Sequence, residues 1–124
     1  MRFPNIKISN HAIGYVQATT FMENRVEKIR FENASGLIWF LEHPHLYTAG
    51  TSSAPSELVN HNNIPIYQTG RGGKYTYHGP GQRIVYVMLD LREQGNDVRG
   101  FVKKLEEWVI VTLKTFNINA KRIN

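Results

Sequence analysis

A glycine-rich segment from Arg71 to Gln82, reading RGGKYTYHGPGQ, holds most of the side chains in this sequence that could hold a ligand. Glycines cluster around Arg71 and again after His78, which costs conformational entropy on folding. Close approach of the backbone to a ligand is the usual reason for such a cost. The Arg71 guanidinium and the neighbouring N–H groups suit a carbonyl or phosphate oxygen, and Lys74 adds positive charge. The segment is therefore a candidate binding site.

The spacing within this segment excludes two common phosphate-binding motifs. It contains no GxxxxGK[ST] loop, and no GxGxxG opens a helix. Tyr75 to His78 are typical of a strand, in which Thr76 and His78 share one face and Tyr75 and Tyr77 share the other. A glycine-rich hairpin without a ligand explains the same spacing, so the pattern by itself leaves both interpretations open.

Outside this segment, the candidates for catalysis are weaker. The chain has no cysteine, which excludes disulfides, thiolate metal sites and thiol nucleophiles within it. A hydroxyl-based triad would have to draw on Ser52, Ser53 and Ser56 as nucleophiles, His43, His45 and His78 as bases, and Asp90 as the group that orients the base. His43 and His45 also suggest a metal pair, but no third ligand stands out. We expect no catalytic residue, metal or cofactor in this chain.

Composition and charge place the chain among ordinary globular proteins. Hydrophobic residues make up 41% of the 124 residues, and the net charge is +5. No acidic residue stands between Glu57 and Asp90, so the middle of the chain is locally positive. Such a balance admits nucleic acid as a partner, but a mildly basic enzyme explains it better. With no signal peptide and no membrane-length apolar run, we expect a cytoplasmic protein without nucleic-acid or membrane partners.

Two long helices are predicted on either side of the glycine-rich segment. The first, His11–Phe31 with Ser9 or Asn10 as N-cap, follows from an apolar stripe expected to lie in the core: Tyr15, Ala18, Met22, Val26 and Ile29. The second, Val98–Phe116 with Asp97 as N-cap, follows from Phe101, Leu105, Trp108, Val109, Thr112 and Phe116.

Short apolar runs predict the strands. The expected strands are an edge strand at Ile6–Ser9, a buried strand at Leu37–Leu41 that resumes at Leu46–Thr48, a strand at Ile64–Gln68, a central strand within Arg83–Leu91 buried on both faces, and a final strand beginning at Ile118–Ile123. One helical turn is expected at Ser56–Val59. Strands alternating with helices predict an α/β or α+β fold, and the length suits a single domain over residues 1–124.

The string RGGxxTYHGPGQ is long and specific, and it resembles the signature of the octanoyltransferases of lipoate biosynthesis. The resemblance extends to LEHPHLYTAGT at Leu41–Thr51, to VYVMLDL at Val85–Leu91 and to the helix that follows, so it covers nearly the whole chain. It implies the fold of the biotin and lipoate protein ligases, a mixed sheet flanked by helices. It also implies that this copy of the catalytic domain is incomplete at the C-terminus.

The resemblance implies a reaction as well. Enzymes of this family move an octanoyl group from acyl carrier protein to a lysine of a lipoyl domain, in 2-oxoacid dehydrogenases or the glycine cleavage H protein. The positions that match the family's substrate-contacting stretch are Arg71, Gly72, Gly73, Lys74, Tyr75, Thr76, Tyr77 and His78.

The family's nucleophile has no counterpart in this chain. In the family the acyl group passes through a cysteine thiolate, whose pKa a nearby lysine lowers. This sequence has no cysteine and no matching lysine motif. We therefore expect a truncated octanoyltransferase that is inactive alone. The alternatives are a noncatalytic remnant that binds an acyl chain or carrier protein, and a ligase relative that adenylates its substrate.

Overall fold

The computed structural model describes residues 2–60 and 62–123. Their internal contacts group them into two compact units, Arg2–Leu89 and a shorter unit that begins at Asp90. The first unit contains β1 (Asn5–Ala12), α1 (Tyr15–Phe31), β2 (Leu37–Glu42), β3 (Leu46–Ala49), the 3-10 turn η1 (Pro55–Glu57), β4 (Ile66–Gln68), β5 (Tyr75–His78) and β6 (Ile84–Met88). The second contains the 3-10 turn η2 (Leu91–Gln94) and α2 (Val98–Lys114).

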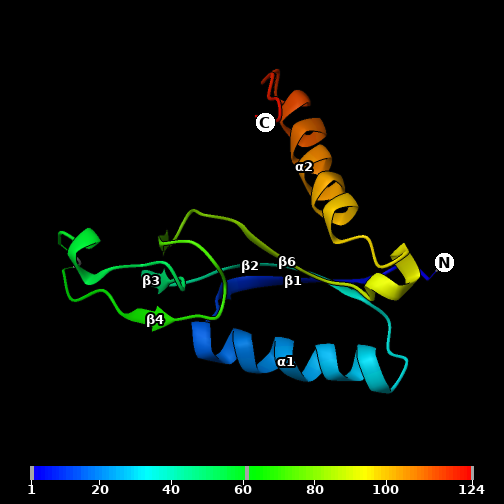
Figure 1. Ribbon diagram of the computed structural model, residues 1–124, viewed down its shortest axis with the longest axis horizontal. Coiled ribbons are helices and arrows are strands. Elements are labelled where there is room, and N and C mark those ends of the chain that lie inside the picture. Colours follow the sequence, from blue (N-terminus) through cyan, green and yellow to red (C-terminus); the bar gives the residue numbers. More distant parts are fainter. Residues whose placement is uncertain (1, 61, 124) are drawn as a thin grey trace. The chain divides into compact units, whose positions relative to one another are not determined.

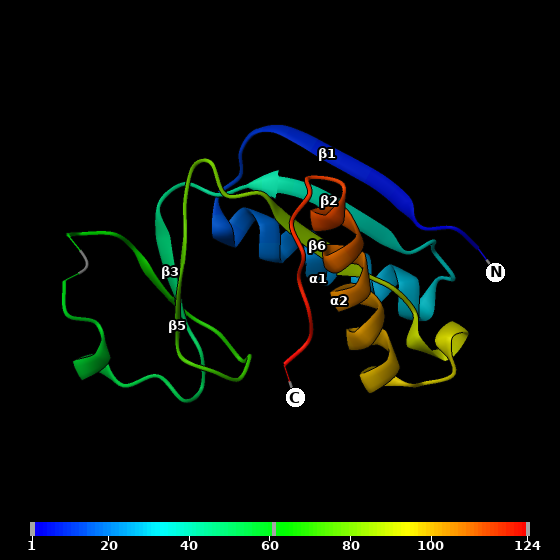
Figure 2. The ribbon, with the colours of Figure 1, turned by 90° about the horizontal axis from the view of Figure 1, so that it is seen from above.

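Strands β1, β2 and β6 form one sheet in that order, with β1 parallel and β6 antiparallel to β2 (Figure 2). Parallel neighbours need a crossover connection, and α1 supplies it. The helix lies along one face of this sheet (Figure 1). Along β2 the side chains alternate, so that Leu37, Trp39 and Leu41 are buried while Ile38 and Phe40 are half-buried.

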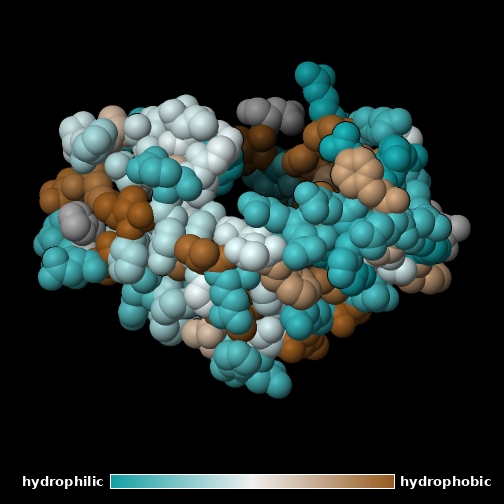
Figure 3. All heavy atoms as spheres, turned by 90° about the horizontal axis from the view of Figure 1, so that it is seen from below, coloured by the Kyte–Doolittle hydropathy of each residue, from teal (hydrophilic) through white to brown (hydrophobic). Residues whose placement is uncertain are grey.

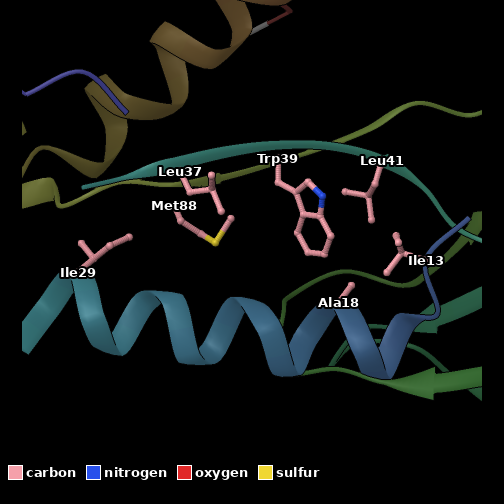
Figure 4. Close-up of a cluster of buried hydrophobic side chains, with 7 residues drawn as sticks. All are labelled: Ile13, Ala18, Ile29, Leu37, Trp39, Leu41 and Met88. Atoms are coloured by element: carbon pink, nitrogen blue, oxygen red, sulfur yellow. The ribbon is translucent and has the colours of Figure 1, made fainter. Parts of the chain in front are cut away.

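The core of the first unit lies between α1 and this sheet. In Figure 4, Ala18 and Ile29 of α1 point toward side chains from β2 and toward Met88 of β6. The buried cluster consists of Ile13, Ala18, Ile29, Leu37, Trp39, Leu41 and Met88. The indole Nε1 of Trp39 donates to Ser9 Oγ at 2.9 Å, which satisfies the polar side-chain atom of a residue that is only 3% exposed. The outward face of α1 is mainly hydrophilic, with scattered apolar side chains (Figure 3).

A second sheet positions the glycine-rich segment. Its order is β4, β3, β5, with β4 parallel and β5 antiparallel to β3. β5 is the part of the glycine-rich segment from Tyr75 to His78, and the register sets Thr76 opposite Thr48 and His78 opposite Leu46. Mixed α/β architecture is confirmed, but the strands divide between two small mixed sheets. The sequence predicted that the buried strand at Leu37–Leu41 resumes at Leu46–Thr48. This is wrong, because β2 belongs to the first sheet and β3 to the second.

The predicted start of the first helix is wrong. Strand β1 continues through Ala12, so His11 is a strand residue, and the helix begins at Tyr15 after Gly14. Pairing with β2 decides this, since Ala12 lies opposite Glu42 and Ile13 N donates to the Glu42 carbonyl at 2.8 Å. The edge strand predicted at Ile6–Ser9 is confirmed and is longer than expected.

The apolar stripe of this helix is buried only in part. Ala18 and Ile29 lie in the core and Tyr15 and Met22 are half-buried. Val26 is 47% exposed, so its predicted place in the core is wrong.

The strand predicted within Arg83–Leu91 is present, but its predicted central position is wrong. β6 is Ile84–Met88, and it pairs with β2 alone among the described strands, so β2 is the centre of its sheet. Only Met88 of β6 is buried, whereas the four residues before it are half-buried. The predicted burial on both faces is therefore wrong for the structure as described. A continuous apolar run indicates that both faces of a strand are at least partly covered, but it does not show which elements cover each face.

The second unit consists of η2, α2 and a C-terminal segment that folds back along α2. The predicted N-cap is confirmed, since the Asp97 side chain accepts from Gly100 N at 2.9 Å. The strand predicted at Ile118–Ile123 is absent from this part of the described chain, and the segment is irregular. Arg122 donates from Nε to Glu106 and from Nη2 to Glu107, each at 2.8 Å, and this holds the segment beside the helix. Neither helix of the described residues combines the length and the apolar character that crossing a membrane requires.

Candidate functional site

The loop Arg71–Lys74 is joined to the loop after β3 by three backbone hydrogen bonds. Thr51 N donates to the Arg71 carbonyl at 2.9 Å, Ser52 N to the Gly73 carbonyl at 3.0 Å, and Gly50 N to the Lys74 carbonyl at 3.0 Å. The loops approach so closely that a Cβ on Gly50 would lie 2.7 Å from the Gly73 carbonyl carbon. Gly73 has φ +89°, a conformation that favours glycine. The predicted binding segment is thus a braced loop.

The guanidinium of Arg71 provides a second connection between the two segments. Nη2 donates to the Thr48 carbonyl at 3.0 Å and to Thr48 Oγ1 at 2.6 Å, while Nη1 donates to the Gly72 carbonyl at 2.9 Å. These three bonds use three of the five N–H donors of the group. The Nε–H and one Nη1–H form no hydrogen bond to a described residue, and they are the donors available to a ligand.

The charge of Lys74 is compensated by Glu57 of η1. Lys74 Nζ forms an ion pair with Glu57 Oε1, and Ala54 N donates to the other carboxylate oxygen at 3.0 Å. These hydrogen bonds lower the pKa of the Glu57 carboxyl, with the Lys74 contact as the larger cause. The Lys74 side chain is nevertheless 66% exposed. The segment is less positive than its sequence predicts, because an acidic residue outside the segment in the sequence folds against it.

After β5 the chain reverses in a tight turn. Gln82 N donates to the Gly79 carbonyl at 3.1 Å, and Gly81 has φ +85° behind Pro80, as a type II turn requires. Gly81 N also donates to Glu42 Oε1 at 3.2 Å, which ties the turn to the end of β2.

Tyr77 lies beside this turn, where its hydroxyl forms a short hydrogen bond with His45 Nδ1. A Cβ on Gly79 would overlap the Tyr77 hydroxyl, so any larger residue there would displace this side chain.

His43, immediately after β2, is fully buried, and both of its ring nitrogens are bonded. Nδ1 lies 2.6 Å from the Ile13 carbonyl oxygen, and Nε2 lies 2.8 Å from the Tyr86 hydroxyl. A carbonyl oxygen only accepts, so the proton is on Nδ1, and in the neutral ring Nε2 accepts from Tyr86. Burial, and to a lesser extent Tyr15, raise the pKa of Tyr86 to about 12, so its hydroxyl stays protonated as this bond requires.

His78 is the member of the predicted site that lies closest to this buried pair. Its ring meets the His43 ring edge-on, with centroids 5.9 Å apart and planes at 88°. Its Nδ1 is buried and has no hydrogen-bond partner among the described residues. Burial, then the nearby His43 and Arg71, lower the pKa of His78. The neutral imidazole is therefore favoured near pH 7.

The other predicted site residues continue the same surface. Gly72 and Gly73 are exposed in the braced loop, Tyr75 is half-buried opposite Ala49, and Thr76 is exposed opposite Thr48. Tyr77 and His78, neighbours in β5, contact different histidines. The segment from Arg71 to His78 thus forms one continuous structure, made of a loop and a strand.

The triad and the metal pair considered from the sequence are not assembled. Ser53 Oγ donates to the Gly50 carbonyl, and none of the three candidate serines is hydrogen-bonded to a histidine within the described residues. His43 and His45 are each bonded to a tyrosine hydroxyl. The described part of the chain contains no cluster of three or more metal-ligating side chains.

Three residues that build the site did not stand out in the sequence. Thr48 accepts a hydrogen bond from Arg71, Glu42 accepts one from the turn, and the Tyr86 hydroxyl donates one to His43. Of these three residues, only Tyr86 could have been noticed in the sequence, because a hydroxyl within an apolar strand must find a hydrogen-bond partner when it is buried.

Comparison with known proteins identifies the family. The model of the lipoyl protein ligase A/B catalytic domain matches residues 14–124. This chain belongs to that family. It is 56% identical over 108 residues to an octanoyltransferase of Chelativorans sp. (strain BNC1), covering 87% of this chain and 44% of the relative. It is 53% identical over 116 residues to an octanoyltransferase of Paramagnetospirillum magneticum (strain AMB-1), covering 94% of this chain and 55% of the relative.

These relatives confirm the resemblance to octanoyltransferases that the glycine-rich string indicates. The chain spans about half the length of the relatives it matches. A solved structure supports the fold at lower identity: protein Ta0514 of T. acidophilum, a candidate lipoate protein ligase, aligns with TM-score 0.66 at 16% identity. That alignment covers 98% of this chain and 52% of the solved chain. The ligase-like α/β fold is thereby confirmed.

Proposed function

We propose that this chain forms the acyl-substrate-binding part of an octanoyltransferase catalytic domain of lipoate biosynthesis. The observation that carries the proposal is the braced structure of Arg71–His78. Its loop is hydrogen-bonded to the segment after β3, and its strand ends at a half-buried neutral histidine. The family and the octanoyltransferase relatives support the assignment of the ligand as an acyl thioester.

The chemistry of the loop suits such a ligand. An acyl thioester offers one carbonyl oxygen that accepts hydrogen bonds, next to an apolar chain. The unbonded N–H donors of Arg71 and the Thr76 hydroxyl are groups of the segment that could donate to that oxygen, and the exposed Gly72 backbone allows close approach. Substrate binding at Arg71, Gly72, Gly73, Lys74, Tyr75, Thr76, Tyr77 and His78 is part of this proposal.

We further infer that these 124 residues alone do not transfer the acyl group. Covalent transfer in the family requires a cysteine thiolate, and this sequence contains none. The partners we propose are octanoyl-acyl carrier protein as donor and a lipoyl domain as acceptor, with the cytoplasm as the place of action. The second candidate function, favoured by the same lack of cysteine, is a noncatalytic module that binds the acyl chain or its carrier.

Binding and transfer are tested separately. Titration of the chain with S-octanoyl-pantetheine, followed by NMR, should shift the signals of Thr76 and His78. Thr76→Val should weaken binding roughly fivefold, the effect of one net hydrogen bond. Thr20→Val is a matched control, because Thr20 is an exposed residue of α1 and lies outside the proposed site.

If a large excess of S-octanoyl-pantetheine shifts no NMR signal of Arg71–His78, the binding proposal is wrong. The second assay mixes the chain with octanoyl-acyl carrier protein and a lipoyl domain, and mass spectrometry measures octanoylation of the acceptor lysine. We expect none, and robust turnover would overturn the inference that the chain is inactive alone.

A further inference from the structure

His43 and Tyr86 lie outside the glycine-rich segment, yet they form the buried side of the site. The His43 ring is enclosed by three aromatic neighbours, with centroids 5.8 Å from Tyr15, 5.8 Å from Tyr86 and 5.9 Å from His78. Its side chain is fully buried and both nitrogens are bonded. A ring in this position can neither rotate nor exchange its tautomer without leaving a buried polar atom unpaired, which costs about 1–3 kcal/mol.

Two segments of the first unit fix the orientation of the His43 ring, one through a backbone carbonyl and one through a tyrosine hydroxyl. The Ile13 carbonyl that accepts from Nδ1 belongs to the connection between β1 and α1, and Ile13 N is itself bonded to the Glu42 carbonyl. Tyr86 lies in β6, where it is opposite Trp39 in the register. The ring of His43 is therefore fixed from the connection between β1 and α1 and from β6 of the first sheet, whereas His78 belongs to β5 of the second sheet.

The unpaired Nδ1 of His78 then defines which nitrogen carries the proton. A buried N–H donor without a partner is rarer in proteins than an under-satisfied acceptor, so the neutral ring keeps its proton on Nε2. The residue as a whole is half-buried while Nδ1 is buried, so the accessible part of the ring lies away from Nδ1. Nε2–H is the polar group that this ring can offer to a ligand.

We propose that His43 and Tyr86 are positioning residues: the Tyr86 hydroxyl fixes the His43 ring, and the edge of that ring fixes the imidazole of His78 so that Nε2–H faces the acyl thioester. The direction of the His78 pKa supports this arrangement, because burial, His43 and Arg71 all disfavour its charged form. The inference rests on the proposed function for the identity of the ligand, but the state of the two rings can be measured without any ligand.

The first test is long-range proton–nitrogen NMR of the full chain, at a pH above the ordinary histidine pKa. The expected result is a single tautomer for each ring, with the proton on Nδ1 in His43 and on Nε2 in His78. An averaged spectrum for His78, or a proton on its Nδ1, would overturn the proposal. This measurement needs no variant and no ligand, so neither a folding defect nor a failure of the proposed function affects it.

The second test compares Tyr86→Phe with Tyr67→Phe. Both substitutions remove only a hydroxyl, and the Tyr67 hydroxyl forms no hydrogen bond to a described residue, although its ring packs against Tyr15. In Tyr86→Phe we expect the His78 spectrum to become averaged between tautomers and the affinity for S-octanoyl-pantetheine to fall roughly fivefold. Tyr67→Phe should change neither. An unchanged His78 spectrum in a folded Tyr86→Phe chain would refute the positioning role.

The outcomes also separate this inference from the proposed function. If the wild-type chain does not bind S-octanoyl-pantetheine, the assignment of the ligand is wrong. The tautomers and their response to Tyr86→Phe still decide whether His43 and Tyr86 fix His78.

Discussion

Substituting Gly50 by alanine should separate the two loops that build the candidate site. A Cβ at this position would lie 2.7 Å from the Gly73 carbonyl carbon and 2.7 Å from Arg71 Nη1, and it would overlap the Gly73 carbonyl oxygen. Two of these atoms are backbone, which cannot move aside as the end of a flexible side chain can. The loop Arg71–Lys74 must therefore shift away from the segment after β3.

The cost follows from what that shift breaks. Overpacking by a methyl group in a tight contact costs about 1–3 kcal/mol. The bonds to Thr51, Ser52 and Gly50 lie at the same contact, and each is worth about 1 kcal/mol net. Because some of these bonds are re-formed with water, we expect a total loss of about 2–4 kcal/mol in the free energy of unfolding.

Urea unfolding provides the assay, followed by the fluorescence of Trp39 in a Trp108→Phe background, so that only the first unit is reported. The matched control is Gly70→Ala, since a Cβ on Gly70 meets no heavy atom within 4 Å and the residue lies in the same loop. We expect the control to lie within about 0.5 kcal/mol of wild type. If Gly50→Ala and Gly70→Ala are equally stable, the two loops are not in the contact described here and the reasoning fails.

Three further predictions concern single side chains. The folded-state pKa of His78 lies below its ordinary value of 6.5, so the unfolded chain binds the proton first and the unfolding free energy falls as pH drops below that value. His78→Gln should abolish this share of the pH dependence in urea titrations at several pH values, and an unchanged slope would contradict it. Leu41→Ala removes a fully buried side chain and should lower the free energy of unfolding in urea by about 2–5 kcal/mol. A loss below about 1 kcal/mol would show that Leu41 does not lie in the core. Asp97→Ala removes the cap of α2 and should cost about 1 kcal/mol, seen as reduced helix content by circular dichroism, and unchanged helicity would speak against the cap.

Local patterns in the sequence predicted the elements wherever one physical signal dominated. The run Leu37–Leu41 is strand β2, and helical spacing after Asp97 is α2. The first helix was placed too far toward the N-terminus, because Ser9 and Asn10 suit a helix cap as well as a strand. The strand is set by the residues on either side of them, because Ile8 pairs with Phe40 and Ala12 pairs with Glu42 of β2, a partner about thirty residues away that a local pattern does not reveal.

The candidate site shows the same division at the level of side chains. The string from Arg71 to His78 could be recognised as a binding segment from its residue types and order. The charge of this segment could not be predicted from the sequence, because Glu57 neutralises Lys74 only after the chain has folded η1 against the loop. The support of His78 could not be predicted either, because His43, which follows β2, and Tyr86 of β6 meet only in the tertiary structure.

By itself, then, the sequence determined the family, the α/β class and the segment that is proposed to hold the acyl group. These depend on residue identity and on short-range spacing, which survive in any conformation. The tertiary structure alone decided where the first helix begins, that the strands form two sheets, and which donors of Arg71 stay unbonded. It also decided which nitrogen of His43 carries a proton, since hydrogen bonds to Ile13 and Tyr86 require three distant segments to meet.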